Sequence, residues 1–358
     1  MQETEQLDIL VIYDASIALS PTVPDSTSLT PFLMDSSRAN YNISYAYFLD
    51  YCHELALKAG FAASSDIIGP GSCSSYWTHD SSGWSKVMRP AHAHQIFDKL
   101  SPSDPERTSE RNLLLSDPSI IPYHDPALFL LFLDKLHTFQ EFPEHSVPTA
   151  SIYSSRPRDI KISLDRLSRL INNHQFPADF GTSLVLKDRF GAGGEHVYKI
   201  KPGDVNAINI IMRDNPTIRF IIQPFLLFDK GFTYRGKKAS TDIRLIIESN
   251  QLFHKYIRIA KGDEFRCNTH QGGQIIYLEE DEIPRDVISI SKVLIKKINK
   301  PHSLYALDFI ISNQGHPYFI EGNSKPGLDW NPNSKVRTAN GHRLIRQIIK
   351  ELARRLNS

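Results

Sequence analysis

Apolar and polar positions follow patterns of two different periods along this chain. The apolar run 7–13 is continuous enough for a buried strand, and the stretch 42–58 has a helical pattern followed by Gly60, which is typical of a helix end. Residues 240–247 and 253–260 alternate between apolar and polar side chains, which predicts two strands. Mixed periods of this kind predict an α/β (α+β) protein.

Two helices are expected outside these regions. The apolar run 127–133 follows Asp125, a suitable N-cap, and Pro126, a favoured first helical residue, and it is too short to span a bilayer. An amphipathic helix is expected near the C-terminus, where basic residues cluster at 343–355. Its apolar stripe is formed by Leu344, Ile345, Ile348, Ile349, Leu352 and Leu356.

A glycine-rich loop lies between two predicted strands within 183–198. Lys187 ends the first strand, and Gly193 and Gly194 are two of the three glycines in the loop. Glycine lets backbone N–H groups approach anionic oxygens, and a lysine adds a point charge, so this loop could cover a polyphosphate. It has neither the Walker A ending nor the Rossmann spacing. A plain hairpin with a glycine-rich turn is the alternative.

Two apolar runs near the C-terminus, 307–311 and 318–320, flank a polar turn and predict a hairpin. Its alternation would bring Asp308, Glu321 and Asn323 together at one end of the sheet. Two carboxylates and an amide oxygen are hard ligands, which suit magnesium held jointly with nucleotide phosphates and suit zinc poorly. An acidic hairpin that faces solvent is the alternative.

Two further stretches have the character of a binding site. In 219–228, Pro224 interrupts an apolar run, which favours a strand that ends in an extended segment whose backbone groups could hold an adenine edge. A buried core strand is the alternative. Alternation places Arg244 on the same face as Asp242, and a hairpin turn would bring Arg258 beside them. An arginine can bind a phosphate or a carboxylate through two parallel hydrogen bonds, so these arginines could contact a ligand. The alternative is that each arginine forms a salt bridge at the surface.

In this order and at these spacings, the segments resemble the ATP-grasp superfamily, most closely the branch with ribosomal-protein glutamate ligases, glutathione synthetases and D-alanine ligases. The resemblance implies an ATP-grasp domain at 121–358 and a small α/β domain at 1–120. The polar run 101–111, which contains two prolines, is the predicted linker. The implied nucleotide-binding residues are Lys135, Lys187, Gly193, Gly194, Gln223, Pro224 and Leu226, with Asp229 or Lys230 at the ribose. The implied metal ligands are Asp308, Glu321 and Asn323, and the implied catalytic residues are Arg258, Arg244 and Asn268.

The resemblance also implies a ligase that uses ATP and Mg²⁺, with Mn²⁺ as the alternative metal, to join a carboxylate to an amine through an acyl phosphate on amino acids or peptides. A nucleotide-binding regulatory module and a small-molecule kinase of the same fold are the alternatives. The formal net charge of +1 argues against nucleic acid binding, so the expected partners are the small substrates, with a homo-oligomer left open. Three scattered cysteines and an acidic N-terminus without a signal-peptide pattern predict a cytoplasmic protein without membrane contact.

Overall fold

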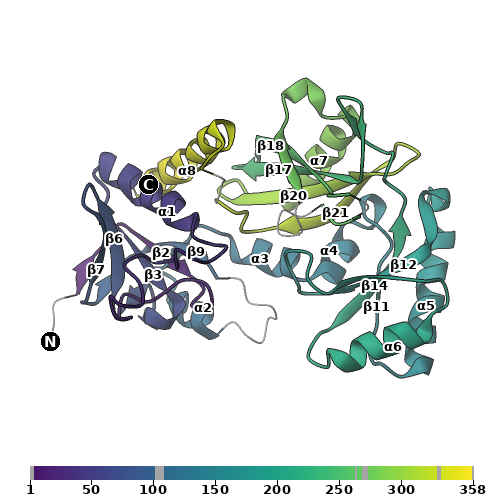
Figure 1. The fold of residues 1–358 in the computed structure, drawn as a ribbon, viewed down its shortest axis with the longest axis horizontal. Coiled ribbons are helices and arrows are strands. Elements are labelled where there is room, and N and C mark those ends of the chain that lie inside the picture. The colour runs from purple at the N-terminus through teal and green to yellow at the C-terminus, as the bar shows by residue number, and fades with distance from the viewer. Residues whose placement is uncertain (1–3, 101–108, 263, 268–272, 329–331, 357–358) are drawn as a thin grey trace. The chain divides into compact units, whose positions relative to one another are not determined.

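The computed structural model describes residues 4–100, 109–262, 264–267, 273–328 and 332–356 (Figure 1). Each of the two parts of the chain described below contains both α-helices and β-sheets, so the predicted mixed α/β class is confirmed. The chain divides into two compact units, Met1–Pro126 with Lys325–Ser358, and Ala127–Ser324. The sequence-based division placed everything after residue 120 in one domain, whereas the structure returns the chain to the first unit after Ser324.

The first unit is built around a six-stranded sheet whose central strands are parallel. β2 (Ile9–Tyr13) lies between β3 (Ala59–Ala63) and β9 (Gln95–Lys99). All β2 side chains are buried, which confirms the strand predicted there. The sheet is completed by β10 (Ile121–Pro122), β6 (Tyr76–Asp80) and β7 (Gly83–Val87). A smaller sheet contains β1 (Glu5–Gln6), β8 (Ala91–His92), β5 (Ser72–Cys73) and β4 (Ile67–Gly69).

Two helices pack together in the first unit, α1 (Tyr41–Glu54) and α8 (Lys335–Leu356). The predicted apolar stripe of α8 is buried except at Leu356. α1 ends earlier than predicted because Ala56 adopts a left-handed conformation with a φ of 57°. Leu57 N then donates to Cys52 O at 2.9 Å, a bond that closes the last turn. Gly60 lies within β3 and does not end the helix.

α2 (Ser109–Leu114) also belongs to the first unit. Arg111 of this helix is buried, and its Nε donates to the buried Asp98 of β9 at 2.9 Å. The linker predicted at 101–111 is therefore wrong for residues 109–111, because a helix anchored by a buried ion pair is part of a folded unit. Residues 101–108 lie outside the described residues.

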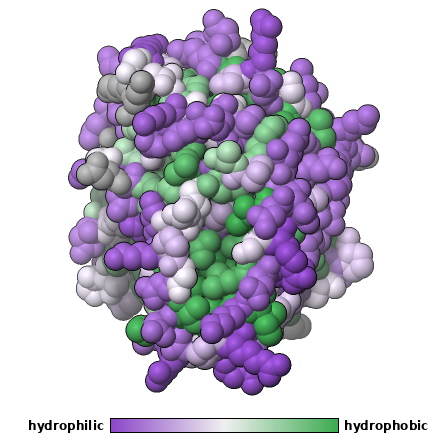
Figure 2. Space-filling view, turned by 90° about the vertical axis from the view of Figure 1, so that its right-hand side faces the viewer, coloured by the Kyte–Doolittle hydropathy of each residue, from purple (hydrophilic) through white to green (hydrophobic). Residues whose placement is uncertain are grey.

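The second unit contains a four-stranded sheet with the order β11–β14–β12–β13. Its strands are β11 (Ala150–Ser151), β14 (Phe220–Leu226), β12 (Phe180–Asp188) and β13 (Val197–Ile200). α5 (Pro157–Asn172) and α6 (Val205–Asp214) pack against this sheet through a core that includes Ile160, Leu167 and Ile208. Figure 2 views the molecule from the side on which Figure 1 draws α5, and shows hydrophilic residues around an apolar area.

A five-stranded antiparallel sheet forms the other part of the second unit, in the order β19–β18–β17–β20–β21. Its strands are β19 (Gln274–Tyr277), β18 (Gln251–Ile259), β17 (Thr241–Glu248), β20 (Leu304–Ile311) and β21 (Pro317–Asn323). α7 (Arg285–Ile298) contributes Val287 and Leu294 to the core on the apolar face of this sheet. The predicted hairpin between β17 and β18 is confirmed, and its turn residues Ser249 and Asn250 both have left-handed φ values.

Two short helices and a short hairpin complete the second unit. α3 (Pro126–Leu133) begins at the predicted proline, and α4 (Lys135–Glu141) begins after Asp134, which acts as its N-cap. β15 (Thr233–Tyr234) and β16 (Lys237–Lys238) form a short hairpin. None of the helices in the described parts of the chain has the length and apolar character needed to cross a membrane.

Candidate functional site

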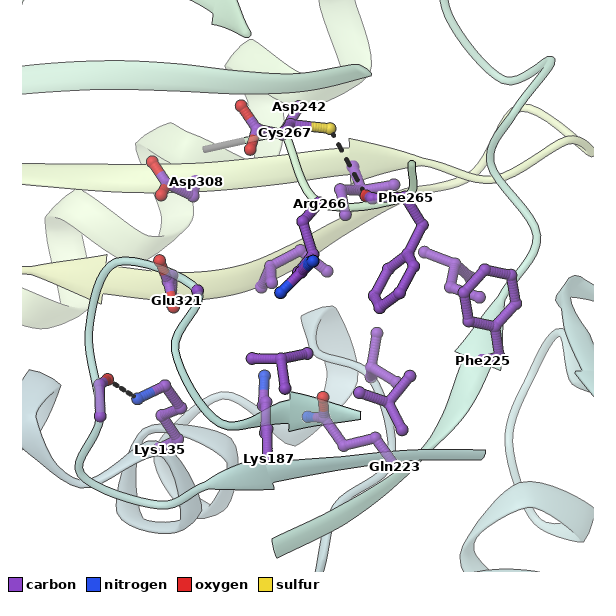
Figure 3. Close-up of a pocket in the computed structure, with 18 of the residues that line it drawn as sticks. Lys135, Lys187, Gln223, Phe225, Asp242, Phe265, Arg266, Cys267, Asp308 and Glu321 are labelled. Atoms are coloured by element: carbon purple, nitrogen blue, oxygen red, sulfur yellow. Dashed lines mark hydrogen bonds between the residues drawn. The ribbon is translucent and has the colours of Figure 1, made fainter. Parts of the chain in front are cut away.

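A pocket in the second unit is lined by residues from both of its sheets and from the glycine-rich loop. Figure 3 shows Lys135 and Glu321 toward one end of this pocket and the rings of Phe225 and Phe265 toward the other. The lining also includes Lys187, Asp188, Gly191, Gly194, Gln223, Pro224, Leu226, Asp242, Arg258, Arg266, Cys267 and Asp308. Charged side chains and aromatic rings thus line the same pocket.

The glycine-rich loop joins β12 to β13, which pair antiparallel as predicted. The start of the loop turns tightly around Asp188, because an added Cβ at Gly191 would lie 2.8 Å from that side chain. Gly193 and Gly194 have φ values of 69° and 79°, which residues with a side chain rarely adopt. Gly194 lines the pocket, whereas Gly193 is not among its lining residues. Phosphate binding by this loop stays a prediction.

Two lysines reach the pocket from different elements. Lys187 of β12 is 7% exposed, and burial lowers its pKa from 10.5 to about 8 although the Glu321 carboxylate opposes that shift. Lys135 begins α4, and its Nζ donates to the backbone oxygen of Gly191. Burial also lowers the pKa of Lys135. Desolvated ammonium groups of this kind gain more from an anionic ligand than surface lysines do.

The opposite end of the pocket is apolar and is formed largely by β14. Phe225 meets the ring of Phe265 edge to face, with ring centroids 5.6 Å apart. Leu226 also lines the pocket and is buried, and Gln223 Nε2 donates to Thr149 Oγ1 at 2.7 Å. Flat apolar surfaces beside a few polar groups are typical of sites for small ligands with a planar ring.

Pro224 lies within β14, so it does not end the strand as predicted. The strand continues to Leu226, and Pro224 lies opposite Leu184 of β12, although the register with β12 shifts between this pair and the pair of Leu226 with Phe180. On its other side β14 is paired with β11, which reaches only as far as Ile222. A proline, which has no N–H, is tolerated at this position because its neighbour on that side has already ended.

Charged side chains lie in register across one face of the five-stranded sheet. Arg258 of β18 lies opposite Asp242 of β17, and Arg244 of β17 lies opposite Asp308 of β20. Asp308 in turn lies opposite Glu321 of β21, as the predicted hairpin requires. The alternate residues of β17 belong to the apolar core on the other face. One face of the sheet therefore carries the charges and the other contributes to the core.

A β-bulge in β21 determines that Glu321 belongs to this row. Phe309 pairs with Phe319, whereas the next pair is Asp308 with Glu321, so Ile320 is an extra residue. Without that extra residue, Ile320 would lie opposite Asp308, and Glu321 would share the face of Phe319. The bulge therefore lets Phe319 enter the core while Glu321 lines the pocket.

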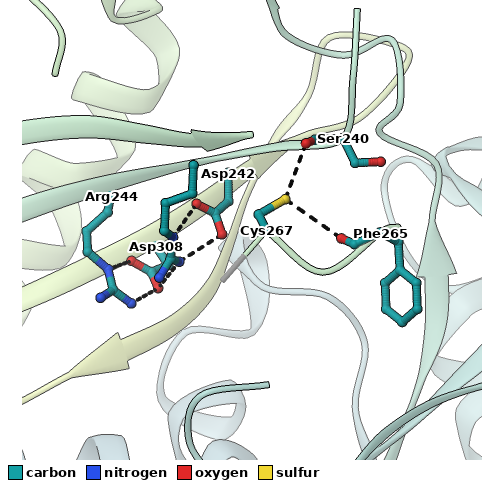
Figure 4. A network of polar contacts seen from close by, with 7 residues as sticks. Ser240, Asp242, Arg244, Phe265, Cys267 and Asp308 are labelled. Atoms are coloured by element: carbon teal, nitrogen blue, oxygen red, sulfur yellow. Dashed lines mark hydrogen bonds and ion pairs between the residues drawn. The ribbon is translucent and has the colours of Figure 1, made fainter. Parts of the chain in front are cut away.

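The two aspartates and two arginines form a buried network (Figure 4). Arg258 donates from Nε and Nη2 to Asp242 at 2.7 and 2.8 Å, and from Nη2 to Asp308 Oδ2 at 2.8 Å. Arg244 Nε donates to Asp308 Oδ1 at 2.6 Å. Burial alone would raise the pKa of Asp308, but the two guanidinium groups outweigh that effect and lower it. Burial raises the pKa of Asp242 despite Arg258.

Asp308 and Glu321 offer neighbouring carboxylates to the pocket, and hard oxygen ligands of this kind fit Mg²⁺. Asn323 lies nearer the end of β21, opposite Ala306, and is not among the lining residues. In the described parts of the chain, no three His, Cys, Asp or Glu side chains are grouped so that they could hold a metal ion. The third protein ligand of the predicted set would therefore be an amide.

Three of the predicted site residues are not among the described lining residues of the pocket. Asp229 and Lys230 follow β14 and are not among the lining residues of the pocket. Asn313 contacts both, since its Nδ2 donates to Asp229 Oδ1 and its Oδ1 accepts from Lys230 N, each at 2.8 Å. Asn268 lies outside the described residues. The ribose contact and the role of Asn268 stay predictions.

Several lining residues were not assigned to the site from the sequence. Asp242 had a signal, because it alternates in phase with Arg244 along one strand. Phe225 and Phe265 had none, since an apolar side chain in a ligand pocket and one in a core look the same in a sequence. Arg266 lies beside them in the lining and is paired with Glu264.

The amino-acid sequence of this chain is similar to a known family model and to several known proteins. The model of the RimK-like ATP-grasp domain matches residues 153–348, more than half of the chain. Proteins named "Probable alpha-L-glutamate ligase" from Legionella pneumophila are 29% identical over 195 residues, which covers 50% of this chain and 59% of theirs. A protein of the same name from Vibrio vulnificus is 28% identical over 144 residues, or 38% of this chain and 44% of its own. The chain thus spans less than two thirds of the length of these relatives.

Solved structures share the fold at low sequence identity. The D-cycloserine synthetase DcsG has a TM-score of 0.57 at 13% identity, covering 95% of this chain and 99% of its own. D-alanyl-alanine synthetase A from Vibrio cholerae has a TM-score of 0.57 at 12% identity, covering 99% and 100%. A RimK domain protein from Sphaerobacter thermophilus has a TM-score of 0.55 at 13% identity, covering 95% and 99%. The predicted ATP-grasp fold is confirmed, and the chain belongs to the RimK-like ATP-grasp family.

Proposed function

We propose that the protein is an ATP-dependent carboxylate–amine ligase that uses Mg²⁺ and acts on an amino acid or a peptide. The observation that carries this proposal is a single pocket in which two lysines and a glycine loop accompany a row of carboxylates and arginines, next to an apolar slot. The curated relatives are named as glutamate ligases, which supports an amino acid or peptide substrate.

In this proposal the apolar end of the pocket holds the nucleotide base, between Phe265 and the side chains of β14. Gln223, Pro224 and Leu226 of β14 all line the pocket and would contact the base. Lys187, Lys135 and the backbone of the glycine loop bind the phosphates. The lowered pKa values of both lysines support this role, because a buried ammonium favours a ligand that returns negative charge to it.

The metal would be held by Asp308 and Glu321, with Asn323 as the third ligand and Mn²⁺ as the alternative ion. When bound, such an ion neutralises phosphate charge during phosphoryl transfer. Asp308 also accepts hydrogen bonds from Arg244 and Arg258, so one carboxylate connects the proposed metal site to the arginines.

The reaction would have two steps. A carboxylate oxygen of the first substrate attacks the terminal phosphorus of ATP, the bond to ADP breaks, and an acyl phosphate forms. An amine then attacks the acyl carbon, phosphate leaves with the bonding electrons, and loss of a proton from nitrogen gives the amide. Arg258 would stabilise the phosphate oxygens, and Asp242 holds the Arg258 guanidinium in one orientation.

The test is a screen with Mg-ATP and pairs of amino acids or short peptides, which follows ADP, phosphate and amide together. We expect all three products in equal amounts for at least one pair. Glu321→Gln should abolish most of this turnover without comparable loss of stability, because it keeps the shape of the side chain and removes a charge from the proposed metal site. A variant as active as the parent would remove Glu321 from that site.

The same assay separates the alternatives. ADP with a stable phosphorylated product and no amide would identify a kinase. Binding of Mg-ATP without turnover for any pair would favour a regulatory module. A melting curve unmoved by millimolar Mg-ATP would contradict nucleotide binding altogether, because ligand at one hundred times its dissociation constant adds about 2.7 kcal/mol to the free energy of unfolding.

A further inference from the structure

The start of the glycine loop is fastened to the start of α4. Arg189 Nε donates to Asp134 Oδ1 at 2.7 Å, and Arg189 Nη2 donates to the other carboxylate oxygen. Lys135 N donates to the backbone oxygen of Arg189 at 3.1 Å, and Lys135 Nζ donates to that of Gly191. Segments more than fifty positions apart in the sequence are thus joined through both backbone and side-chain atoms.

Asp134 is held in place independently of this contact. Its Oδ1 accepts from Leu136 N at 3.0 Å and from His137 N at 3.2 Å, which caps α4. Its side chain is 17% exposed and that of Arg189 is 26% exposed, so the pair is partly shielded from water. Burial would raise the pKa of Asp134, but Arg189 and the cap bonds lower it. Two parallel bonds to a fixed carboxylate also orient the arginine, unlike a mobile surface ion pair.

We propose that Arg189 and Asp134 are positioning residues for phosphate recognition. They hold the Lys135 amine and the start of the glycine loop in one arrangement, so that both meet the same phosphate groups. Neither residue lines the pocket, so each acts through Lys135 and the loop. The inference rests on the proposed function, because it takes the ligand of this pocket to be ATP.

The arrangement of the pocket makes a specific prediction about ligands. The slot proposed for the base is formed by β14 and Phe265. None of the hydrogen bonds described above joins the pair of Arg189 and Asp134 to these residues. Loss of the pair should therefore weaken binding of the phosphates and leave binding of the nucleoside unchanged. A general loss of structure would weaken both.

The experiment compares Mg-ATP with adenosine in the full chain. Arg189→Met removes both bonds to Asp134 and keeps an unbranched side chain of similar length. Dissociation constants are measured by competition against a fluorescent ADP analogue, and stability is measured by urea unfolding. We expect Mg-ATP binding to weaken about tenfold or more, as for loss of a coupled pair, while adenosine binding changes less than about twofold.

Two further variants test the pairing itself. Asp134→Asn keeps a good N-cap for α4 and removes the charge that faces Arg189. Arg189→Met and Asp134→Asn both break the same contact. The affinity of the double variant for Mg-ATP should therefore equal that of the single variant that binds Mg-ATP more weakly. Arg189→Lys keeps the charge without the planar fork and should lie between the parent and Arg189→Met.

Arg156→Met is the control for removing an arginine that pairs with aspartate away from the pocket. Arg156 also pairs with an aspartate in the first turn of a helix, with Nε and Nη2 both 2.8 Å from Asp159 Oδ2 of α5, but its side chain is 79% exposed, and neither residue lines the pocket. This variant should bind both ligands like the parent. If Arg189→Met keeps the parental affinity for Mg-ATP, or loses adenosine affinity to the same extent, the positioning role is overturned. If the parent itself does not bind Mg-ATP, the proposed function fails instead.

Discussion

Lys187 differs from an ordinary lysine because it is desolvated before a ligand arrives. Burial lowers its pKa to about 8, because the nearby Glu321 carboxylate offsets only part of the effect of burial. The unfolded chain should bind this proton up to about pH 10.5. Between about pH 8 and 10.5 the unfolded state therefore holds more protons, so the unfavourable contribution of Lys187 to stability declines as pH rises through that window.

The same shift predicts how nucleotide binding depends on pH. Phosphates bound beside Lys187 should raise its pKa, so binding above pH 8 requires proton uptake and the affinity for Mg-ATP should fall there. Calorimetry in two buffers of different ionisation enthalpy would show uptake at pH 9 and little at pH 7. Lys187→Arg should bind without this uptake because arginine stays charged. Equal uptake in parent and variant would mean that another group titrates.

Arg258 offers a second test at the scale of a single residue. Arg258→Lys should lower ligation turnover on the order of a hundredfold, because an ammonium cannot span Asp242 and Asp308 as the planar guanidinium does. The affinity for Mg-ATP should stay close to that of the parent. Since Arg258 is buried, urea unfolding must accompany the assay to separate lost stability from lost chemistry. Parental ligation by this variant would remove Arg258 from the mechanism.

At the scale of elements, the turn between β20 and β21 is tied to the segment that follows β14. Asn313 N donates to Leu227 O at 2.7 Å, and Asn313 Nδ2 donates to Asp229 Oδ1 at 2.8 Å. His316 and Tyr318 both contact the buried carboxylate of Asp179, at 2.9 and 2.6 Å. The hairpin that carries the proposed metal ligands is therefore joined to the strand that forms the apolar slot.

The closest approach in this region is at Gly231. An added Cβ there would lie 1.9 Å from the backbone oxygen of Ile311 and 2.5 Å from that of Ser312, and backbone atoms cannot rotate away. Gly231→Ala should lower the free energy of unfolding by about 3 kcal/mol, measured with urea. Gly69→Ala is the control, since nothing lies within 4 Å of its Cβ position, and its effect should stay within about 0.5 kcal/mol. Similar effects at both sites would contradict the close approach.

At the scale of the whole chain, buried charges hold the C-terminal segment in the first unit. Asp98 accepts from Lys325 Nζ and from Arg111 Nε, and Lys99 Nζ donates to the backbone oxygens of Lys325 and Pro326. Burial alone would raise the pKa of Asp98, but Lys325 and Arg111 lower it well below its usual range. The chain is thus anchored in the first unit immediately after it leaves the second.

Deletion of residues 335–358 tests this division of the chain. The deletion removes α8, which packs against α1, so the first unit should lose its cooperative unfolding transition. The pocket should still bind Mg-ATP, because all of its lining residues lie within Ala127–Ser324. Calorimetry of the parent and the deletion variant, each with and without Mg-ATP, would show which transition is lost and which the ligand raises. Loss of Mg-ATP binding in the variant would contradict the assignment.

Local patterns account for the features that were predicted correctly. The buried strand near the N-terminus, the two C-terminal hairpins and the stripe of α8 each follow from periodicity over a few residues. The charged row was partly predictable, since Asp242 and Arg244 alternate along one strand and Asp308 lies on a second. The apolar end of the pocket was less predictable, because nothing in the sequence around Phe225 and Phe265 distinguishes a ligand site from a hydrophobic core.

The sequence by itself determined most element types, the order of the segments that resemble ATP-grasp proteins, and the residues proposed to bind phosphate and metal. Tertiary structure decided which of these residues meet. The extra residue Ile320 turns Glu321 toward Asp308, and Arg189 meets Asp134 across more than fifty positions. It also decided that residues 325–358 belong to the first unit. The physical reason is that periodicity reports each element's own preference, whereas register, bulges and buried ion pairs depend on free energies shared between distant segments.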